Sequence, residues 1–305
     1  MSVTTEGGKG MSKRNVAVIG LGNMGTALAR ALLAADLRVT VWNRSEAKSR
    51  VLEAEGAWCA VSPASAVEES EIVVVCVADH VLVYELLDGA DLQGRTVVML
   101  TAGSADESRR LADHLRDRGA QFVEGQIGTY PDAVGTPHSR IFYAGSEQAM
   151  CDARAATEAL GGAAPLGSDI GSVSGLAAAI RTYYVATSVT TVLAMEVARR
   201  HGVPLATAFA EIDLLHPIVQ EGVRESLTDA GPTESSSERL TLERLADGVA
   251  DLVALTRQCG LDPSMLAEAE RVLELAVSRG HGSAAVGTAS LVLDATGGPT
   301  PGTGV

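Results

Sequence analysis

The stretch Asn15-Val-Ala-Val-Ile-Gly-Leu-Gly-Asn-Met-Gly25 decides the fold of this chain. Its first five residues predict a buried strand, and a helical pattern across about Met24 to Ala35 follows the glycines. Glycines at this spacing, between a strand and a helix, allow a tight turn and let backbone N–H groups approach a pyrophosphate. The stretch therefore predicts a dinucleotide site, with these candidate cofactor-binding residues: Gly20, Leu21, Gly22, Asn23, Met24 and Gly25.

The end of the second predicted strand, Val39 to Trp42, indicates which dinucleotide binds. An acidic residue at this point would hold the ribose hydroxyls of NAD, but the chain has Asn43-Arg44-Ser45, with Lys48 one helical turn later. Two cations and a hydroxyl at a helix start suit the 2′-phosphate of NADP, although solvated surface is the alternative for both cations. Val77 and Thr101, at the ends of two later strands, are further candidate cofactor-binding residues.

The rest of the first half alternates strands with helices. Further strands are predicted at Ile72 to Val77, Thr96 to Leu100, Gln121 to Glu124 and Ile141 to Ala144, with helices between them. Ser45 to Glu55 is one such helix, with Ser45 as its N-cap. This alternation predicts βαβ units and a parallel sheet.

The second half is helical almost throughout from about Gly171. An apolar helix is predicted from Ser172 to His201, ending at Gly202, and Pro204 begins the next helix, about Leu205 to Glu225. A polar loop at residues 229–237 precedes helices at about Leu242 to Cys259 and Pro263 to Ser278. A second subunit is expected to cover the long helix, because the small helical domain has too few partners for it.

The predicted class is therefore α/β, with an N-terminal Rossmann domain, a long interdomain helix and an all-helical C-terminal domain. The expected boundaries are residues 13–170 for the NADP-binding Rossmann domain, 171–202 for the interdomain helix and 203–295 for the helical dimerisation and substrate domain. Residues 1–12 and 296–305 are expected to be tails.

Composition excludes several other classes of function. The formal net charge of -14 argues against nucleic acid as a partner. The four cysteines show no metal-ligand spacing, which fits a reducing, cytoplasmic compartment and no metal site. The chain has no apolar stretch long enough to span a membrane, and its first ten residues lack the hydrophobic core of a signal peptide.

Four motifs resemble those of the NADPH-dependent imine reductases, relatives of the β-hydroxyacid dehydrogenases and 6-phosphogluconate dehydrogenases. They are Val-Ile-Gly-Leu-Gly-Asn-Met-Gly (18–25), Val-Trp-Asn-Arg-Ser (41–45), Leu-Thr-Ala-Gly-Ser (100–104) and Arg-Gly-His-Gly (279–282). The resemblance covers about Arg14 to Leu293. It implies an interlocked homodimer with NADPH as cofactor, and an active site between one subunit's Rossmann domain and the partner's helical domain.

A hydroxyacid dehydrogenase of the same fold is the main alternative. Such enzymes resemble one another in carrying a catalytic lysine on the interdomain helix, but the lysines of this chain are only Lys9, Lys13 and Lys48. The segment Glu124-Gly-Gln-Ile-Gly128 also lacks their carboxylate-binding Ser-Gly-Gly pattern. An alcohol-oxidising enzyme needs a group that takes the hydroxyl proton, so imine reduction is favoured.

The resemblance places the family's usual Asp or Tyr proton donor at Ala177, and its Asn at Met99. The proton is therefore expected from water or a tyrosine, unless the substrate arrives already cationic. The candidate catalytic residues are Tyr184 first, then Tyr183, Asp213 and His216, although a structural role stays open for each. Arg181, which shares a helix face with Ala177, is expected to have an anionic partner.

Small residues at Ala177 and Ala178 would enlarge the substrate pocket. A bulky aromatic imine, such as a fused bisindole of secondary metabolism, is then a candidate beside simple cyclic imines. A non-catalytic NADP-binding sensor is a second alternative, because it too could lack the proton donor.

Overall fold

The structure is a computed structural model that describes residues 14–161, 163–228 and 241–293. The predicted tails, residues 1–12 and 296–305, and the predicted polar loop at 229–237 lie outside the described residues. The chain divides into two compact units, Met1–Thr182 and Tyr183–Val305.

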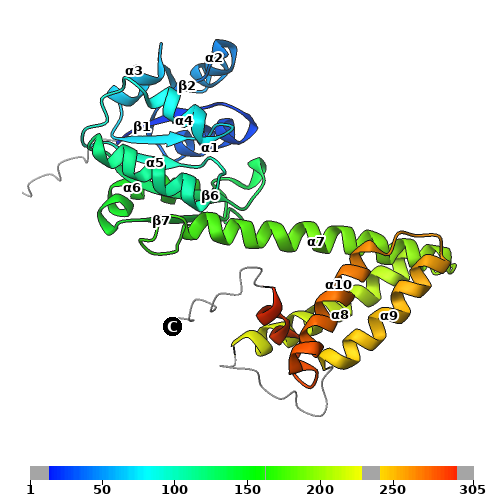
Figure 1. Cartoon of the computed structure of the whole chain (residues 1–305). Coiled ribbons are helices and arrows are strands. Elements are labelled where there is room, and N and C mark those ends of the chain that lie inside the picture. The colour runs from blue at the N-terminus through cyan, green and yellow to red at the C-terminus, as the bar shows by residue number, and fades with distance from the viewer. Residues whose placement is uncertain (1–13, 162, 229–240, 294–305) are drawn as a thin grey trace, which may run out of the picture. The chain divides into compact units, whose positions relative to one another are not determined.

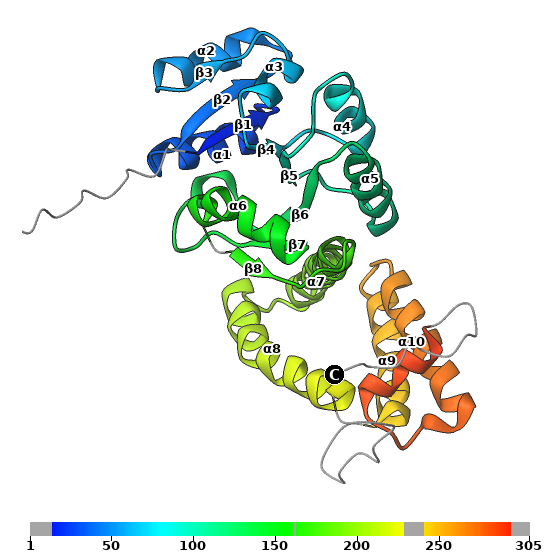
Figure 2. The ribbon, with the colours of Figure 1, turned by 90° about the vertical axis from the view of Figure 1, so that its left-hand side faces the viewer.

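The first unit contains one eight-stranded sheet in the order β3-β2-β1-β4-β5-β6-β7-β8 (Figure 1, Figure 2). Its strands are β1 (Asn15–Ile19), β2 (Arg38–Trp42), β3 (Trp58–Cys59), β4 (Ile72–Val75), β5 (Thr96–Met99), β6 (Gln121–Ile127), β7 (Ile141–Gly145) and β8 (Ala163–Pro165). The order of its first six strands is that of the dinucleotide-binding fold. Every predicted strand is confirmed, whereas the short strands β3 and β8 were not foreseen.

The predicted parallel sheet is confirmed for every pair of strands except one. β6 and β7 are antiparallel, with Gly125 opposite Tyr143, and all the other pairs are parallel. A parallel return needs a crossover, usually an α-helix, and the connection between these strands has only the short 3-10 helix η1 (Pro131–Ala133). The chain therefore turns back beside β6.

Six α-helices connect the strands of this unit. They are α1 (Asn23–Ala34), α2 (Glu46–Ala54), α3 (Pro63–Glu68), α4 (His80–Leu87), α5 (Ala105–Asp117) and α6 (Glu147–Leu160). Ser62, Asp79, Ser104 and Ser146 cap four of them through their side chains. Ser45 occupies the N-cap position of α2 as predicted, but its side chain makes no capping hydrogen bond.

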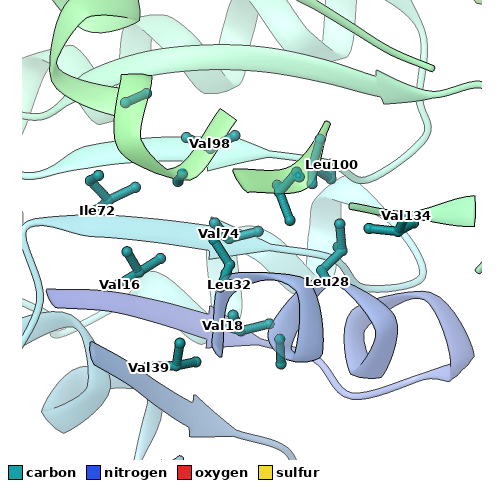
Figure 3. Packing of buried hydrophobic residues seen from close by; sticks show 14 of the residues in the cluster. Val16, Val18, Leu28, Leu32, Val39, Ile72, Val74, Val98, Leu100 and Val134 are labelled. Carbon is teal, nitrogen blue, oxygen red and sulfur yellow. The ribbon is translucent and has the colours of Figure 1, made fainter. Parts of the chain in front are cut away.

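The central strands are buried on both faces because their apolar residues alternate between two cores. Val16 and Val18 of β1 pack with Leu28 and Leu32 of α1, as Figure 3 shows. Ala17 and Ile19, which point to the other face, belong to a second core with residues of α3, α4 and α5. The helices on both faces thus hold the sheet rigid beneath the carboxyl ends of its strands.

The long helix α7 (Ser172–Arg200) begins in the first unit and continues into the second, and it confirms the predicted helix to within one residue (Figure 1). Gly202, with φ of 72°, follows its end as predicted. The second unit continues with α8 (Leu205–Thr228), α9 (Leu242–Gln258), α10 (Ser264–Ala276) and the short helices η2 (Val277–His281) and η3 (Val286–Val292). The motif Arg-Gly-His-Gly lies at η2, where Gly280 has φ of 90°.

Three findings bear on the classes of function excluded above. Among the described helices, none combines the length and the hydropathy that crossing a bilayer requires. The described residues contain no group of His, Cys, Asp and Glu side chains that could hold a metal ion. All four cysteines of the chain are unpaired thiols.

Candidate functional site

The three glycines between β1 and α1 play three different structural roles. Gly20 has φ of 95°, and a Cβ atom on it would lie 2.3 Å from the Cys76 carbonyl oxygen. A Cβ atom on Gly25 would lie 1.9 Å from the Gly20 carbonyl oxygen. Around Gly22, by contrast, a Cβ atom would meet nothing within 4 Å. The first and third glycines therefore form the turn, and the second leaves its backbone open to a ligand.

The N-terminus of α1 opens onto this free space. Gly22 is its N-cap residue and makes no side-chain capping bond, so the N–H groups of the first turn have no such partner. The partial positive charge of a helix start, with exposed N–H groups, favours a phosphate. The residues present thus fit the pyrophosphate of a dinucleotide.

A cleft of about 390 Å³ lies over the glycine turn. Its walls include most of the predicted cofactor-binding residues, namely Gly20, Leu21, Gly22, Asn23, Met24, Gly25, Asn43, Arg44 and Val77. Trp42, Cys76, Ala78, Leu82 and Leu86 complete the lining and were not foreseen as site residues. Their position at the end of β2, just after β4 and on α4 is the signal that could have identified them. Burial raises the pKa of the Cys76 thiol to about 11, so this residue contributes apolar surface rather than a thiolate.

Asn43 connects two parts of the cleft. Its Oδ1 accepts a hydrogen bond from the Leu21 N–H at 3.0 Å, and its Nδ2 donates to the Ser45 carbonyl oxygen at 3.1 Å. Both bonding groups of the amide are therefore used within the protein. Asn43 holds the Asn-Arg-Ser turn against the glycine turn.

Arg44, Ser45 and Lys48 are exposed beside this connection. Within the described part of the chain, neither Arg44 nor Lys48 has an ion-pair partner. The acidic side chain between Ser45 and Lys48, Glu46, is instead bound by Arg50 at 2.5 Å. Positive charge and an uncommitted hydroxyl therefore meet at the end of β2, although only Arg44 of the three lines the cleft.

Thr101 lies behind the cleft rather than in its wall. Its side chain is only 3% exposed, and its Oγ1 accepts a hydrogen bond from the Val77 N–H at 3.2 Å. The hydroxyl thus ties the loop after β5 to the loop after β4. Direct contact with a cofactor stays a prediction for Thr101.

The second unit brings together two of the predicted catalytic residues. The Tyr183 hydroxyl in α7 lies 2.9 Å from Nε2 of His216 in α8, and Gln220 Nε2 donates to the same hydroxyl at 2.8 Å. The tyrosine oxygen thus accepts from Gln220 and is also hydrogen-bonded to His216, where the tautomer of the imidazole decides which atom donates. The three residues form a connected polar network in a mostly apolar region.

Tyr184 and Asp213 do not join this network. Tyr184 is 66% exposed, and no hydrogen bond links it to any described residue. Asp213 is also exposed. It lies one turn before Pro217 in α8, and because proline has no N–H, the backbone carbonyl of Asp213 lacks its usual helical hydrogen bond. The sequence favoured Tyr184 over Tyr183 as a catalytic residue. Among the described residues, however, only Tyr183 has polar partners.

A groove of about 300 Å³ between α7 and α8 has His216 in its wall. Two of its threonines donate back to their own helix, Thr190 to the Ala186 carbonyl and Thr191 to the Thr187 carbonyl. Their hydroxyl protons are thus not offered to a ligand. His216 is the titratable group of this groove.

Ala177, where the resemblance placed the family's proton donor, is buried and only 8% exposed. Arg181, one turn later, forms no salt bridge with any described residue, so its expected anionic partner stays a prediction. A further residue near this end of α7 was missed. Glu124 in β6 is 1% exposed and bonds to Gly171 and Ser174, and a lone acid within an apolar strand was its signal.

The strand order, the glycine turn and the cleft above it define a dinucleotide-binding protein with a Rossmann-type domain and a helical second part. Comparison with known proteins agrees. Residues 15–167 match the family described as the NAD binding domain of 6-phosphogluconate dehydrogenase.

Two solved structures are similar over nearly the whole chain. An imine reductase from Myxococcus stipitatus in complex with NADP+ is 31% identical, with a TM-score of 0.84, over 92% of this chain and 100% of that chain. A reductive aminase from Aspergillus terreus in complex with NADPH4, cyclohexanone and allyl amine is 27% identical, with a TM-score of 0.79 and the same coverage.

A curated relative, the NADPH-dependent reductive aminase of Aspergillus oryzae, is 34% identical over 167 residues, which are 54% of this chain and 56% of that protein. The chain thus spans about half the length of the curated relatives it matches. Taken with the match of the first domain and the full-length structural similarity, the chain belongs to the imine reductase family, within the 6-phosphogluconate dehydrogenase-like superfamily. The family predicted from the four motifs is confirmed.

Proposed function

We propose that this protein is an NADPH-dependent reductase that transfers hydride to the C=N bond of an imine or iminium substrate. The observation that carries the proposal is the cleft over Gly22, open to a pyrophosphate and bordered by the unpaired Arg44. The similar imine reductase of Myxococcus stipitatus was solved with NADP+, which supports the same cofactor here.

The preference for NADPH over NADH rests on charge at the end of β2. A carboxylate at this point would bind ribose hydroxyls and repel a 2′-phosphate. Arg44 and the hydroxyl of Ser45 are instead available, because Asn43 is committed to the protein and Glu46 is bound by Arg50. A planar guanidinium that can bind two oxygens of a phosphate at once favours NADP(H).

Reduction of a C=N bond requires a hydride at carbon and a proton at nitrogen. When bound, NADPH supplies the hydride. The chain has no acid at Ala177, so the proton comes from elsewhere unless the substrate is already an iminium. We assign this role to Tyr183, whose hydroxyl is hydrogen-bonded to His216 and Gln220, in preference to the unpartnered Tyr184.

The same network explains how the Tyr183 hydroxyl would regain its proton. After the phenol gives up its proton, His216 can return one from solvent, because its imidazole is exposed on α8. Gln220 would keep the tyrosine oxygen in place through its donated hydrogen bond. Asp213 and Tyr184 are left as candidate pocket residues that bind the substrate rather than protonate it.

A homodimer is part of the proposal because α7 and α8 expose many large apolar side chains. Those of the second unit include Tyr184, Val185, Val189, Val192, Leu214, Leu215, Ile218 and Val219, each about half exposed or more. An apolar surface of this extent is typical of a subunit interface. A second copy of the chain is the proposed cover, and its helical part is proposed to complete the active site.

The substrate class is proposed from the small residues of α7. Ala177 and Ala178 leave more room than an Asp or a Tyr would, so bulky aromatic imines, including fused bisindoles of secondary metabolism, are candidates beside cyclic imines. The four unpaired thiols support a reducing compartment such as the cytoplasm.

The test is NADPH consumption by the purified protein with small cyclic imines, bulky aromatic imines and 2-oxo acids in parallel. The expected result is turnover of imines and no turnover of 2-oxo acids. Turnover of 2-oxo acids alone would support a hydroxyacid dehydrogenase instead. Tight binding of NADPH without turnover of any of these substrates would support a non-catalytic sensor.

A further inference from the structure

Four polar side chains are buried together in the first unit, and none of them lines the cofactor cleft. Glu124 comes from β6, Ser174 from α7, Ser108 from α5 and His80 from the start of α4, and none is more than 8% exposed. We call these four residues the root cluster, because they meet where α7 begins.

Glu124 binds the first turn of α7 with both of its carboxylate oxygens. Oε2 accepts from the Gly171 N–H at 2.7 Å, and Oε1 accepts from the Ser174 hydroxyl at 2.5 Å. A carboxylate is favourable here because the N-terminus of a helix carries partial positive charge. β6 therefore holds the start of α7 through a buried, charge-assisted contact.

Gly171 also brings α7 against α5. Its φ is 106°, and a Cβ atom on it would lie 2.9 Å from both Ala105 Cβ and Arg109 Cζ. Arg109 in turn approaches Asp169, just before the helix, at 3.7 Å. The direction in which α7 leaves the sheet is thus set by β6 and α5 together.

The root cluster reaches from α7 to the loop after β5. Ser108 Oγ lies 3.4 Å from Ser174 Oγ and 3.4 Å from Nε2 of His80. The His80 ring packs so closely on Gly103 that a Cβ atom there would lie 1.9 Å from its Cε1. Gly103 therefore leaves the space that the imidazole occupies.

Residues 101–104 are connected to the cofactor cleft as well. Thr101 bonds to the Val77 N–H, and Val77 lines the cleft. In a doubly wound sheet, β4 to β6 form the second mononucleotide-binding half, so this loop lies at the end expected for the nicotinamide. This last assignment rests on the proposed function, whereas the contacts do not.

We infer that the root cluster couples the start of α7 to the loop of residues 101–104, and that Glu124 and Ser174 are positioning residues for the reaction. The cluster keeps the nicotinamide loop and the helix that follows the sheet in one fixed arrangement. Neither residue exchanges a proton with the substrate in this scheme.

The first test compares two serines in the same helical turn. Ser174→Ala removes a member of the cluster, whereas Ser172→Ala removes a hydroxyl that has no hydrogen-bond partner among the described residues. Amide hydrogen exchange of the full-length protein is the readout, which needs no catalysis. Ser174→Ala is expected to speed exchange at residues 101–104 by roughly threefold or more, and Ser172→Ala is expected to leave it unchanged.

Coupling is reciprocal, so a change in the loop of residues 101–104 must also alter hydrogen exchange at the start of α7. Gly103→Ala forces His80 to move and is expected to speed exchange at residues 171–175. If each substitution changes exchange only in its own segment, the coupling is absent and the inference fails. If Gly103→Ala does not fold, the Ser174 and Ser172 pair still decides the question.

The kinetic test separates positioning from mere stability. With an imine that is turned over, Ser174→Ala is expected to lower kcat roughly tenfold while the NADPH dissociation constant stays within about twofold. Ser174→Thr, which keeps the hydroxyl, is expected to recover most of the loss. An unchanged kcat in Ser174→Ala, or an equal loss in Ser172→Ala, would contradict the positioning role. Absence of any imine turnover would refute the proposed function but would leave the exchange test valid.

Discussion

Asn43 Oδ1 accepts a hydrogen bond from the Leu21 N–H at 3.0 Å, across 22 residues of sequence. The same amide donates to the Ser45 carbonyl, so one side chain holds the glycine turn and the Asn-Arg-Ser turn together. The part of the cleft suited to pyrophosphate and the part suited to a 2′-phosphate are therefore kept in a fixed relation.

Asn43→Ala is expected to lower the free energy of unfolding by about 1–3 kcal/mol, because it leaves the part-buried Leu21 N–H without its partner. Urea denaturation measures the change. Arg44→Ala is the matched control, because the neighbouring guanidinium has no ion pair to lose, and its stability is expected to stay within about 0.5 kcal/mol of the unsubstituted protein. Equal stability of the two variants would show that the Asn43 bridge is unimportant.

Arg44→Ala is expected to weaken NADPH binding by roughly 10- to 100-fold and to leave NADH binding unchanged, because only NADPH carries the 2′-phosphate. Fluorescence titration of both cofactors provides the dissociation constants. Arg50→Ala serves as the control, since that arginine is occupied by Glu46 at 2.5 Å. An equal loss of affinity for NADPH and NADH would show that Arg44 does not contact the 2′-phosphate.

Replacement by alanine is expected to have opposite effects at two glycines of the turn. Gly22→Ala is expected to fold with unchanged stability but to lose NADPH affinity, because its Cβ would fill space left open for the ligand. Gly25→Ala is expected to destabilise the fold by about 1–3 kcal/mol or more, because its Cβ would lie 1.9 Å from the Gly20 carbonyl oxygen. Thermal unfolding and NADPH titration distinguish them. Normal NADPH affinity in Gly22→Ala would show that the pyrophosphate does not bind at this turn.

Tyr183→Phe is expected to lower kcat on the order of 100-fold with a neutral imine, because it removes the hydroxyl that bonds to His216. Tyr184→Phe, one residue away and without a polar partner, is the control and is expected to change kcat little. A preformed iminium substrate should be insensitive to both changes. Unchanged turnover of a neutral imine by both variants from about pH 6 to about pH 9 would eliminate tyrosine as the proton source.

Stability is expected to fall in mild acid because of His80. Burial lowers the pKa of His80 below its ordinary value of 6.5, although Glu107, Glu124 and Asp79 act in the opposite direction. The unfolded chain therefore takes up this proton at a higher pH than the folded chain does. The contribution is fully present above about pH 6.5 and is lost as the pH falls from there through the lowered pKa.

Urea denaturation between neutral pH and mild acid measures this effect. His80→Gln is expected to flatten the dependence of unfolding free energy on pH, and His138→Gln, at an exposed position, is expected to leave it as it is. A steeper loss of stability in His80→Gln would mean that His80 is not the group responsible.

The local features of the fold could be predicted from the sequence because they depend on neighbouring residues. Continuous runs of buried apolar residues give β1 and β4, and the spacing of Gly20, Gly22 and Gly25 gives the turn. The end of α7 follows likewise from Gly202. The antiparallel direction of β7 could not be read in this way, because it depends on the path of the chain between two strands.

Hydrogen-bond partners that lie far apart in the sequence could not be predicted either, because they also depend on the path of the chain. Tyr183 and Tyr184 are adjacent, and only the packing of α7 on α8 decides which one meets His216. Glu124 bonds to Gly171 from 47 residues away, a contact that no local pattern contains. The hydroxyl of Thr101 likewise accepts a hydrogen bond from the Val77 N–H, 24 residues away.

The most direct measurement of the central claim follows the hydride itself. The protein is incubated with an imine and with NADPH that carries deuterium at the transferred position, and the amine is analysed by mass spectrometry and NMR. Our account predicts one deuterium on the carbon of the former C=N bond. An unlabelled amine, or bound NADPH with no amine formed from any imine tested, would contradict it.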